Sequence, residues 1–389
     1  MHFYTSVAQN YLPKARVLAK SVRKYCKDSY FSLVISDNLP DNFDLSQEPF
    51  DEVVHITELG IPVENLNNWI FIHRVVEICT AVKGQALLNF LQAGHSDKVV
   101  YLDPDTAVFD DLTELEGLLD KHSIVLTPHI TIPEEGEQAI WDNEICALKH
   151  GVNNLGFVAV RNSEDGLAFA KFWRDRLLHF CYDDIPNGIF TDQRWVDLAV
   201  GYFDGVHVLR KPNYNVATWN ISHRQVEEKD GRFYVNGLPL QFYHFSGFDS
   251  GAQESMLARY GKDNPALYKL REWYIAQQDE NGQQELGKKP ITYAFYSNGE
   301  KIPDGARMLM RNDKTVQAQF GQEDPFDANG AYYAWSKAAL QTSPFAGESN
   351  SDLRYLKEEN AALRASLNKY HKLLAPALAV YRLLKGKKA

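Results

Sequence analysis

Residues 98–112 read KVVYLDPDTAVFDDL, and this stretch decides the fold. Its first part, Lys98–Leu102, has the short apolar run that is typical of a buried strand. The strand stops at Asp103-Pro-Asp105, a turn-forming tripeptide. Two carboxylates one residue apart therefore follow directly on the end of a buried strand.

Short apolar runs alternate with helical patterns on both sides of this stretch. This order predicts an α/β fold with a mostly parallel sheet. Ligands of such sheets bind beyond the carboxyl ends of the strands, which is where Asp103 and Asp105 are expected. Strands are predicted at His2–Tyr4, Phe31–Ile35, Val53–Ile56, Ser123–Thr127 and Gly156–Val160, and helices at Tyr11–Tyr25 and at Phe71–Gln92, the second interrupted by Gly84.

Composition excludes several classes of protein. The chain has 389 residues, 44% of them hydrophobic, and a formal net charge of -10, so no nucleic-acid partner is expected. The four cysteines are scattered, without the paired spacing of a zinc site, and reduced thiols are expected. The first twenty residues lack the apolar core of a signal peptide, and no long apolar run could cross a membrane. We therefore expect a cytoplasmic protein.

The composition of the sequence changes along the chain, and these changes predict four parts. Residues 1–250 are expected to form the catalytic domain, and 251–340 a mixed, partly helical appendage. A Ser-, Pro- and Gly-containing linker is predicted at 341–351. Residues 352–389 carry leucines at alternating spacings of three and four, with Asn360 in the same stripe, and then a basic end. That pattern predicts a short coiled coil and a homodimer, with a tail that contacts the inner membrane face or a partner enzyme.

The aspartates of Asp103-Pro-Asp105 are candidate ligands for a hard cation. Two carboxylates on a turn at a strand end can face one metal, which phosphate oxygens can share. Such a metal offsets the charge that develops on a departing diphosphate. The motif is short, and the alternative is a turn whose aspartates cap the next helix.

The stretch VVYLDPDTAVFDDL resembles the strand and D-x-D turn of the glycosyltransferase family 8-like group, which includes glycogenin and bacterial lipopolysaccharide galactosyltransferases. The resemblance covers about residues 1–250, and its tract from Asp192 to Arg224 is closer to a bacterial polysaccharide-biosynthesis subgroup. Its weight comes from the order of several short motifs. These are Tyr11-x-x-x-Ala15-x-Val17-Leu18-x-x-Ser21, Asn154-Leu155-Gly156-Phe157, Thr191-Asp192-Gln193 and Tyr243-His244-Phe245-Ser246-Gly247.

The resemblance implies a glycosyltransferase-A type domain and a role for each matched residue. Asp103, Asp105 and His244 are implied as ligands of Mn²⁺ or Mg²⁺, and imidazole favours manganese. Asp192, Gln193 and Asn154 are implied at the donor sugar. The remaining implied contacts with a nucleotide-sugar, expected to be UDP-linked, are Thr5, Tyr11, Lys83, Gly156 and Gly247.

The residues alone leave other interpretations open. His244 lies between aromatics, where a structural histidine is the default. Tyr11 could serve core packing, Lys83 could be an exposed helix lysine, and Asp192 is one of several loop aspartates. An acceptor subsite could be lined by Trp219 and Asn220, with His223 and Arg224, and the alternative is a buried tryptophan beside a turn asparagine.

One motif departs from the family. Members of the group usually follow the H-F-x-G segment with Lys-Pro-Trp, whose lysine contacts the phosphates, whereas Phe248-Asp249-Ser250 stands here. Another cation must then meet the diphosphate. Lys83 is the candidate we favour, with Arg194 and Arg224 as others.

The predicted function is transfer of a hexose to a glycan or lipid-linked glycan in polysaccharide biosynthesis, with retention of anomeric configuration implied by the resemblance. A sugar-nucleotide pyrophosphorylase is a first alternative, but its loop after the first strand is rich in glycine, and TSVAQNYLPK has none. A non-catalytic glycan-binding or scaffold protein is a second, against which the presence of Asp103, Asp105, Asp192 and His244 argues.

Overall fold

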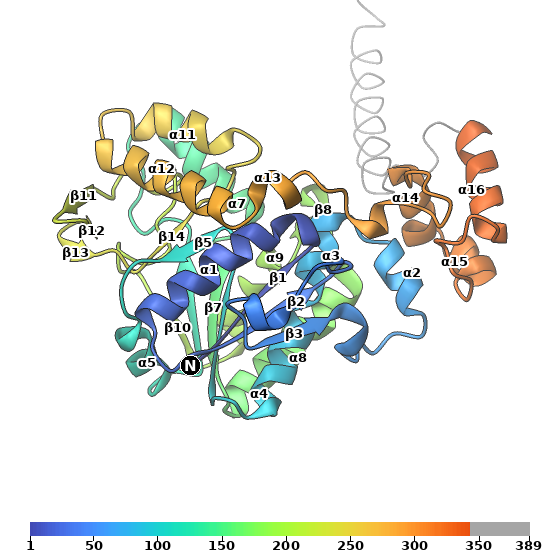
Figure 1. Cartoon of the computed structure of the whole chain (residues 1–389), viewed down its shortest axis with the longest axis horizontal. Coiled ribbons are helices and arrows are strands. Elements are labelled where there is room, and N and C mark those ends of the chain that lie inside the picture. The colour runs from blue at the N-terminus through green and yellow to red at the C-terminus, as the bar shows by residue number, and fades with distance from the viewer. Residues whose placement is uncertain (343–389) are drawn as a thin grey trace, which may run out of the picture.

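A computed structural model describes residues 1–342 of the chain (Figure 1). Its centre is a seven-stranded sheet in the order β10-β6-β7-β4-β1-β2-β3. All neighbours in it run parallel except β7, which is antiparallel to β4 and β6. The predicted α/β fold with a mostly parallel sheet is therefore confirmed. The strands are β1 His2–Val7, β2 Tyr30–Ile35, β3 Glu52–His55, β4 Lys98–Leu102, β6 Ile124–Pro128, β7 Asn153–Arg161 and β10 Val206–Val208.

Helices cover both faces of the sheet, because alternate residues of its strands point to opposite sides. On β4, Val99 and Tyr101 pack against α4 and α8, whereas Val100 and Leu102 pack against α1 and α5. The result is a three-layer arrangement with an apolar core on each side of the sheet. These helices are α1 Leu12–Tyr25, α3 Val75–Ala81, α4 Lys83–Ala93, α5 Thr113–Leu119 and α8 Glu164–Phe180.

The predicted helix Phe71–Gln92 is divided. Its first residue ends α2, Leu66–Phe71, residues 72–74 are not helical, and the remainder forms α3 and α4, which are separated at Val82. The break therefore lies before Gly84, and Gly84 itself is inside α4. A Cβ atom on Gly84 would lie 2.6 Å from the backbone nitrogen of Arg174, so this glycine allows α4 and α8 to cross closely.

Small sheets and short helices border the carboxyl ends of the central strands. β14 pairs antiparallel with β5, which brings His244 opposite Thr106, one residue after Asp105. The segment between β6 and β7 contains a π-helix, Ile140–Ile145. The other elements of this region are β5 Thr106–Val108, α6 Glu137–Ala139, α7 Cys146–His150, β8 Asp183–Asp184, β9 Ile189–Phe190, α9 Gln193–Val196, α10 Ala199–Tyr202, β11 Val226–Lys229, β12 Arg232–Val235, β13 Leu238–Pro239 and β14 Phe242–His244.

The chain after residue 250 packs in two places. Leu257 and Tyr274 share one core with Val17 of α1 and Tyr243 of β14, whereas Tyr332 belongs to a separate cluster around Phe71. Figure 1 shows the last helices together at one end of the molecule, beside α2. The predicted helical appendage is present, and its boundary at residue 250 stays a prediction. The helices are α11 Ala252–Tyr260, α12 Pro265–Glu280, α13 Gln283–Leu286, α14 Asp304–Asn312, α15 Lys314–Phe320 and α16 Ala331–Thr342.

Several predictions concern residues or partners that the structure does not describe. The coiled coil and basic tail at 352–389, and all but the start of the linker at 341–351, lie outside the described residues. Within residues 1–342, no helix is both long and apolar enough to cross a membrane. The cytoplasmic location, the homodimer and the membrane or partner contact stay predictions.

Candidate active site

A cavity of about 730 Å³ opens where the central strands end. Ser6 at the end of β1, Asp103 after β4 and His129 after β6 line it, as does Asn154 at the start of β7. β7 contributes its amino end because it runs antiparallel to its neighbours. The cavity therefore lies at the carboxyl edge of the parallel strands, where the fold predicts a ligand.

Asp103, Asp105 and His244 form a group that could hold a metal ion. One ligand atom from each lies within 4.8 Å of the others, and all three line the cavity. Nε2 of His244 is 3.1 Å from Oδ1 of Asp105 and 3.8 Å from Oδ2 of Asp103. Two carboxylates and an imidazole suit manganese better than magnesium. The structure thus brings together the three residues that the resemblance implied as ligands.

The His244 ring is oriented by Asn154 and Gly156. Nδ1 of His244 lies 3.2 Å from Oδ1 of Asn154, an oxygen that also accepts from the Gly156 and Asn215 nitrogens. An amide oxygen accepts, so Nδ1 carries the hydrogen and Nε2 is the nitrogen left for a metal. A Cβ atom on Gly156 would lie 2.3 Å from Cε1 of His244. Gly156 therefore allows the ring to approach the backbone of β7.

A proton can occupy the place of the metal at His244. Burial lowers the pKa of this histidine, but Asp105 and then Asp103 outweigh it, and the pKa is raised above the ordinary value. With Nδ1 facing Asn154 and Nε2 facing Asp105, both ring nitrogens of the metal-free site have acceptors. A metal at Nε2 must displace this proton.

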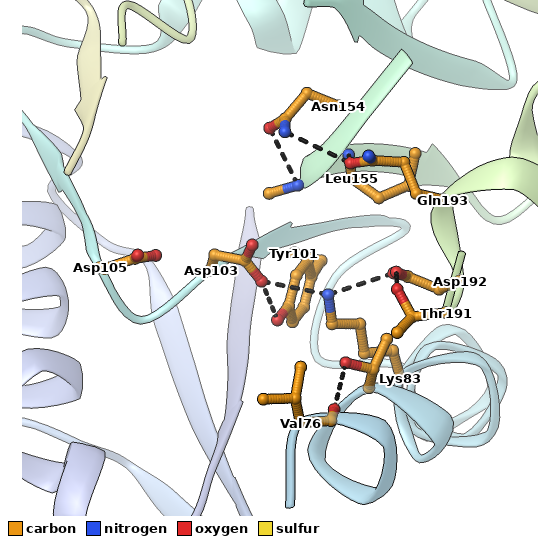
Figure 2. Close-up of polar contacts among 12 residues, drawn as sticks. Val76, Lys83, Tyr101, Asp103, Asp105, Asn154, Leu155, Thr191, Asp192 and Gln193 are labelled. Carbon is orange, nitrogen blue, oxygen red and sulfur yellow. Dashed lines mark hydrogen bonds and ion pairs between the residues drawn. The ribbon is translucent and has the colours of Figure 1, made fainter. Parts of the chain in front are cut away.

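Lys83 lies between Asp103 of the candidate metal group and Asp192 on the far wall of the cavity (Figure 2). Its Nζ lies 3.1 Å from Oδ1 of Asp103 and 3.1 Å from Oδ2 of Asp192, and 4.3 Å from the centre of the Tyr101 ring. Lys83 is 5% exposed, so it is not the exposed helix lysine of the alternative interpretation. Burial lowers its pKa, but the two carboxylates outweigh burial and raise it, so the ammonium stays charged.

Asp192 and Gln193 differ in what their side chains face. Asp192 is buried, lines the cavity and follows Thr191, whose φ of +42° is unusual for a residue other than glycine. Gln193 instead accepts from the nitrogen of Leu155 at 2.9 Å and donates to the carbonyl oxygen of His150 at 2.9 Å. Gln193 therefore holds the wall of the cavity, and Asp192 offers a carboxylate oxygen to it.

The structure places the other predicted contacts in different surroundings. Tyr11 lines the cavity, whereas Thr5 is fully buried in β1 and is not part of the lining. Gly247 has a φ of +74° in the loop after β14. Arg194 donates to the carbonyl oxygen of Leu148, and Arg224 to those of Tyr214 and Asn215. Neither arginine lines the cavity, which leaves Lys83 of the three candidate cations for the diphosphate.

The sequence reasoning did not single out Tyr101 or His129, which also line the cavity. The Tyr101 hydroxyl donates to Oδ1 of Asp103 at 2.5 Å, and Nε2 of His129 accepts from Nδ2 of Asn154 at 3.1 Å. Two features of the sequence point to these residues. Tyr101 is two residues before Asp103 and so points to the same side of the strand, and His129 follows β6 at its carboxyl end.

Of the candidate acceptor residues, Trp219 alone borders the cavity. Its ring meets that of His244 edge to face at 5.2 Å. Asn220 donates to the carbonyl oxygens of His129 and Asn215 and so fixes the loop that carries Trp219. Beyond Trp219, the lining continues over Asn143, Cys146 and Ala147.

No family model matches the chain. It is 29% identical over 254 residues to the uncharacterized protein YfnD of Bacillus subtilis (strain 168), which covers 64% of this chain and 78% of that protein. It is 29% identical over 177 residues to the uncharacterized protein YfnF of the same organism, which covers 44% of this chain and 57% of that protein.

Glycosyltransferases are found among the solved structures that are similar to this chain. The galactosyltransferase LgtC, in complex with donor and acceptor sugar analogs, has a TM-score of 0.40 and 18% identity over 75% of this chain and 98% of its own. The glycosyltransferase GlyE of Streptococcus pneumoniae TIGR4 has a TM-score of 0.39 and 16% identity, and covers 76% of this chain and 66% of its own.

Proposed function

We propose that the chain is a metal-dependent glycosyltransferase that moves a hexose from a UDP-linked donor to a glycan or lipid-linked glycan acceptor. One observation carries the proposal. A single cavity collects the group Asp103, Asp105 and His244, with Lys83 beside it and the carboxylate of Asp192 across from it. A metal group next to a buried cation fits a diphosphate, and a carboxylate beyond them fits a hydroxylated sugar ring.

The donor atoms of the site fit a divalent metal. Asp103, Asp105 and His244 would hold it, and Asn154 keeps Nε2 of His244 turned toward both carboxylates. When bound, such a metal offsets negative charge on the diphosphate that leaves the sugar. Of manganese and magnesium, this mixed set of oxygen and nitrogen ligands favours manganese.

The remaining residues would bind and orient the donor. Lys83 stays charged in the cavity and would meet a phosphate oxygen, since phosphate is a stronger attractor of an ammonium than a carboxylate already shared with another cation. Asp192, on the opposite side of Lys83 from Asp103, would contact the sugar. Asn154 and Gln193 hold the wall of the cavity through hydrogen bonds to each other and to β7. Retention of configuration is proposed from the resemblance alone.

The acceptor would enter on the side of Trp219. Aromatic rings pack well on the apolar faces of sugars, and this ring lies against His244 at the edge of the metal group. An acceptor hydroxyl held there would lie on the side of the cavity away from Lys83.

The first prediction concerns the metal ligands. Asp103→Asn and Asp105→Asn should each abolish manganese-dependent UDP binding and sugar transfer, because each removes a charged ligand. UDP binding is measured by calorimetry with and without Mn²⁺, and transfer by release of UDP from UDP-hexoses. Asp110→Asn, a matched change at a half-buried aspartate that does not line the cavity, should bind and react like the original chain.

The same assays separate the alternatives. Unchanged manganese-dependent binding in both variants would remove the metal assignment. Formation of a sugar nucleotide from a nucleoside triphosphate and a sugar phosphate would indicate a pyrophosphorylase. Binding of glycans without turnover of any sugar nucleotide would indicate a binding or scaffold protein.

A further inference from the structure

Lys14 is a buried lysine that is not among the residues lining the cavity, and its partner is a half-exposed aspartate. Lys14 of α1 forms an ion pair with Asp249, and its side chain is 2% exposed, against 47% for the aspartate. Nζ of Lys14 also lies 3.8 Å from the centre of the Tyr11 ring. The Tyr11 hydroxyl donates to the same carboxylate oxygen, Oδ2 of Asp249, at 2.6 Å. One oxygen of a half-exposed carboxylate thus accepts hydrogen bonds from both a buried ammonium and a tyrosine of the cavity wall.

Asp249 lies in a short loop that has a glycine at each end. The segment Gly247–Gly251 connects β14 to α11, and the glycines at both of its ends have positive φ, +74° and +77°. Between them, the hydroxyl of Ser250 donates to the carbonyl oxygen of Gly247 at 3.2 Å. The loop starts three residues after His244, and Ser246 beside it lines the cavity. Asp249 is therefore carried by a loop that borders the metal group.

Lys14 reaches the edge of the cavity through Tyr11, which lines the cavity and whose ring centre lies 3.8 Å from Nζ of Lys14. Lys83 is shared between two carboxylates, and Arg194 and Arg224 hold backbone carbonyl oxygens elsewhere. Lys14 differs from all three because its partner is one carboxylate that solvent can reach.

The segment around Asp249 is also where the family motif is missing. The resemblance predicts a phosphate-binding lysine shortly after Gly247, and the chain has Phe248-Asp249-Ser250 there. The loop thus carries an acid in the region where a cation was expected, and this acid is paired with a lysine of α1.

We propose that Lys14 is the second cation of the donor-diphosphate site, and that Asp249 holds it until the diphosphate arrives. The inference rests on the proposed function. Phosphate oxygens would replace Oδ2 of Asp249 at Nζ of Lys14, and the Gly247–Gly251 loop would turn aside at its two glycines. One anion exchanges for another, so the buried ammonium is never left without a partner, a state that is strongly unfavourable. Tyr11, released from Asp249 in the same step, is then free to contact the nucleoside.

The experiment compares a nucleoside diphosphate with its parent nucleoside. The original chain is first titrated with UDP, GDP, ADP and CDP in Mn²⁺, and the tightest ligand and its nucleoside are then used with the variants. Lys14→Met should weaken diphosphate binding about tenfold, the effect of losing one charge-assisted hydrogen bond, and leave nucleoside binding unchanged. Lys14→Arg should keep most of the affinity. Lys98→Met is the matched control, since Lys98 is also buried and paired, with Asp120, at the opposite end of β4 from Asp103.

Asp249→Asn distinguishes a held cation from an ordinary structural ion pair. Under the proposal it lowers the melting temperature of the ligand-free protein, because Lys14 loses its partner, yet tightens diphosphate binding by about threefold, because the competitor is gone. Weaker binding in Asp249→Asn would overturn the inference, as would equal losses of diphosphate and nucleoside in Lys14→Met. If the original chain binds no nucleoside diphosphate in Mn²⁺, the proposed function fails and this inference fails with it. If it binds one and Lys14→Met binds equally well, only the inference fails.

Discussion

At the scale of single residues, the candidate site depends on a side chain that orients one of its candidate metal ligands. Oδ1 of Asn154 lies within hydrogen-bond distance of His244, Gly156 and Asn215, so this amide cannot also serve as a free sugar contact through that oxygen. Its position decides which nitrogen of His244 faces Asp105. We propose that Asn154 positions His244 of the candidate metal group, and the sugar contact that the resemblance implied stays a prediction.

This role predicts an effect of Asn154 on metal affinity. Asn154→Ala should weaken Mn²⁺ binding by about 10- to 100-fold, as expected when the outer partner of a histidine ligand is lost. Asn154→Asp keeps an oxygen acceptor for Nδ1 of His244 and should recover most of the affinity. Calorimetric titration of Mn²⁺ without nucleotide measures both variants. Equal affinity in Asn154→Ala and the original chain would show that the hydrogen bond to His244 does not matter for the metal.

At the scale of elements, local sequence patterns predicted the bounds of a central strand but not the direction of every strand. The strand Lys98–Leu102 was predicted with its correct bounds, and its end at Asp103 put the candidate metal group at the carboxyl edge of the sheet. Chain direction was not predictable in the same way, because a buried antiparallel strand such as β7 has the same apolar run as a parallel one. Helix breaks are also hard to locate, because Val82 has no feature of a helix end.

The close crossing of α4 and α8 leads to a prediction for Gly84. Gly84→Ala should destabilise the protein by about 1–3 kcal/mol, because the new methyl group would meet the backbone of Arg174 and Trp173. Since Lys83 precedes Gly84, nucleotide affinity should fall as well. Gly117→Ala on α5 is the control, because nothing lies within 4 Å of a Cβ atom there. That change should be neutral or stabilising by about 0.4–1 kcal/mol. Urea unfolding measures both, and equal stabilities would contradict the proposed crossing.

At the scale of the whole molecule, the helices after residue 290 form part of the support for the cavity. Arg311 of α14 forms a buried ion pair with Glu77, and Arg307 donates to the carbonyl oxygens of Phe71 and His73. Glu77 also accepts from the nitrogen of Arg74, and both Arg74 and Glu77 line the cavity. The sequence predicted a helical appendage here. The contacts of Arg307 and Arg311, however, join residues 234 or more positions apart, and a single sequence contains no signal for such pairs.

His73, at this junction, predicts how stability depends on pH. Burial, and then Arg311, lowers the pKa of His73 from 6.5 to about 4, and Nδ1 lies 2.6 Å from the carbonyl oxygen of Trp69. In the unfolded chain the ordinary pKa of 6.5 applies. Between pH 6.5 and about 4, the unfolded state therefore binds a proton at His73 that the folded state does not bind. The contribution of His73 is therefore complete above pH 6.5 and is lost as the pH falls toward 4.

The loss should be about 1 kcal/mol in the free energy of unfolding between pH 7.5 and 5.5. His73→Gln keeps a donor for the Trp69 carbonyl but cannot take up a proton, so its stability should fall less over this range than that of the original chain. His179→Gln, an exposed position on α8, should leave the pH dependence as it is. Urea unfolding at both pH values, without metal, measures the difference. Parallel losses in His73→Gln and the original chain would show that His73 is solvated in the folded protein, and that α14 does not seal this junction from water.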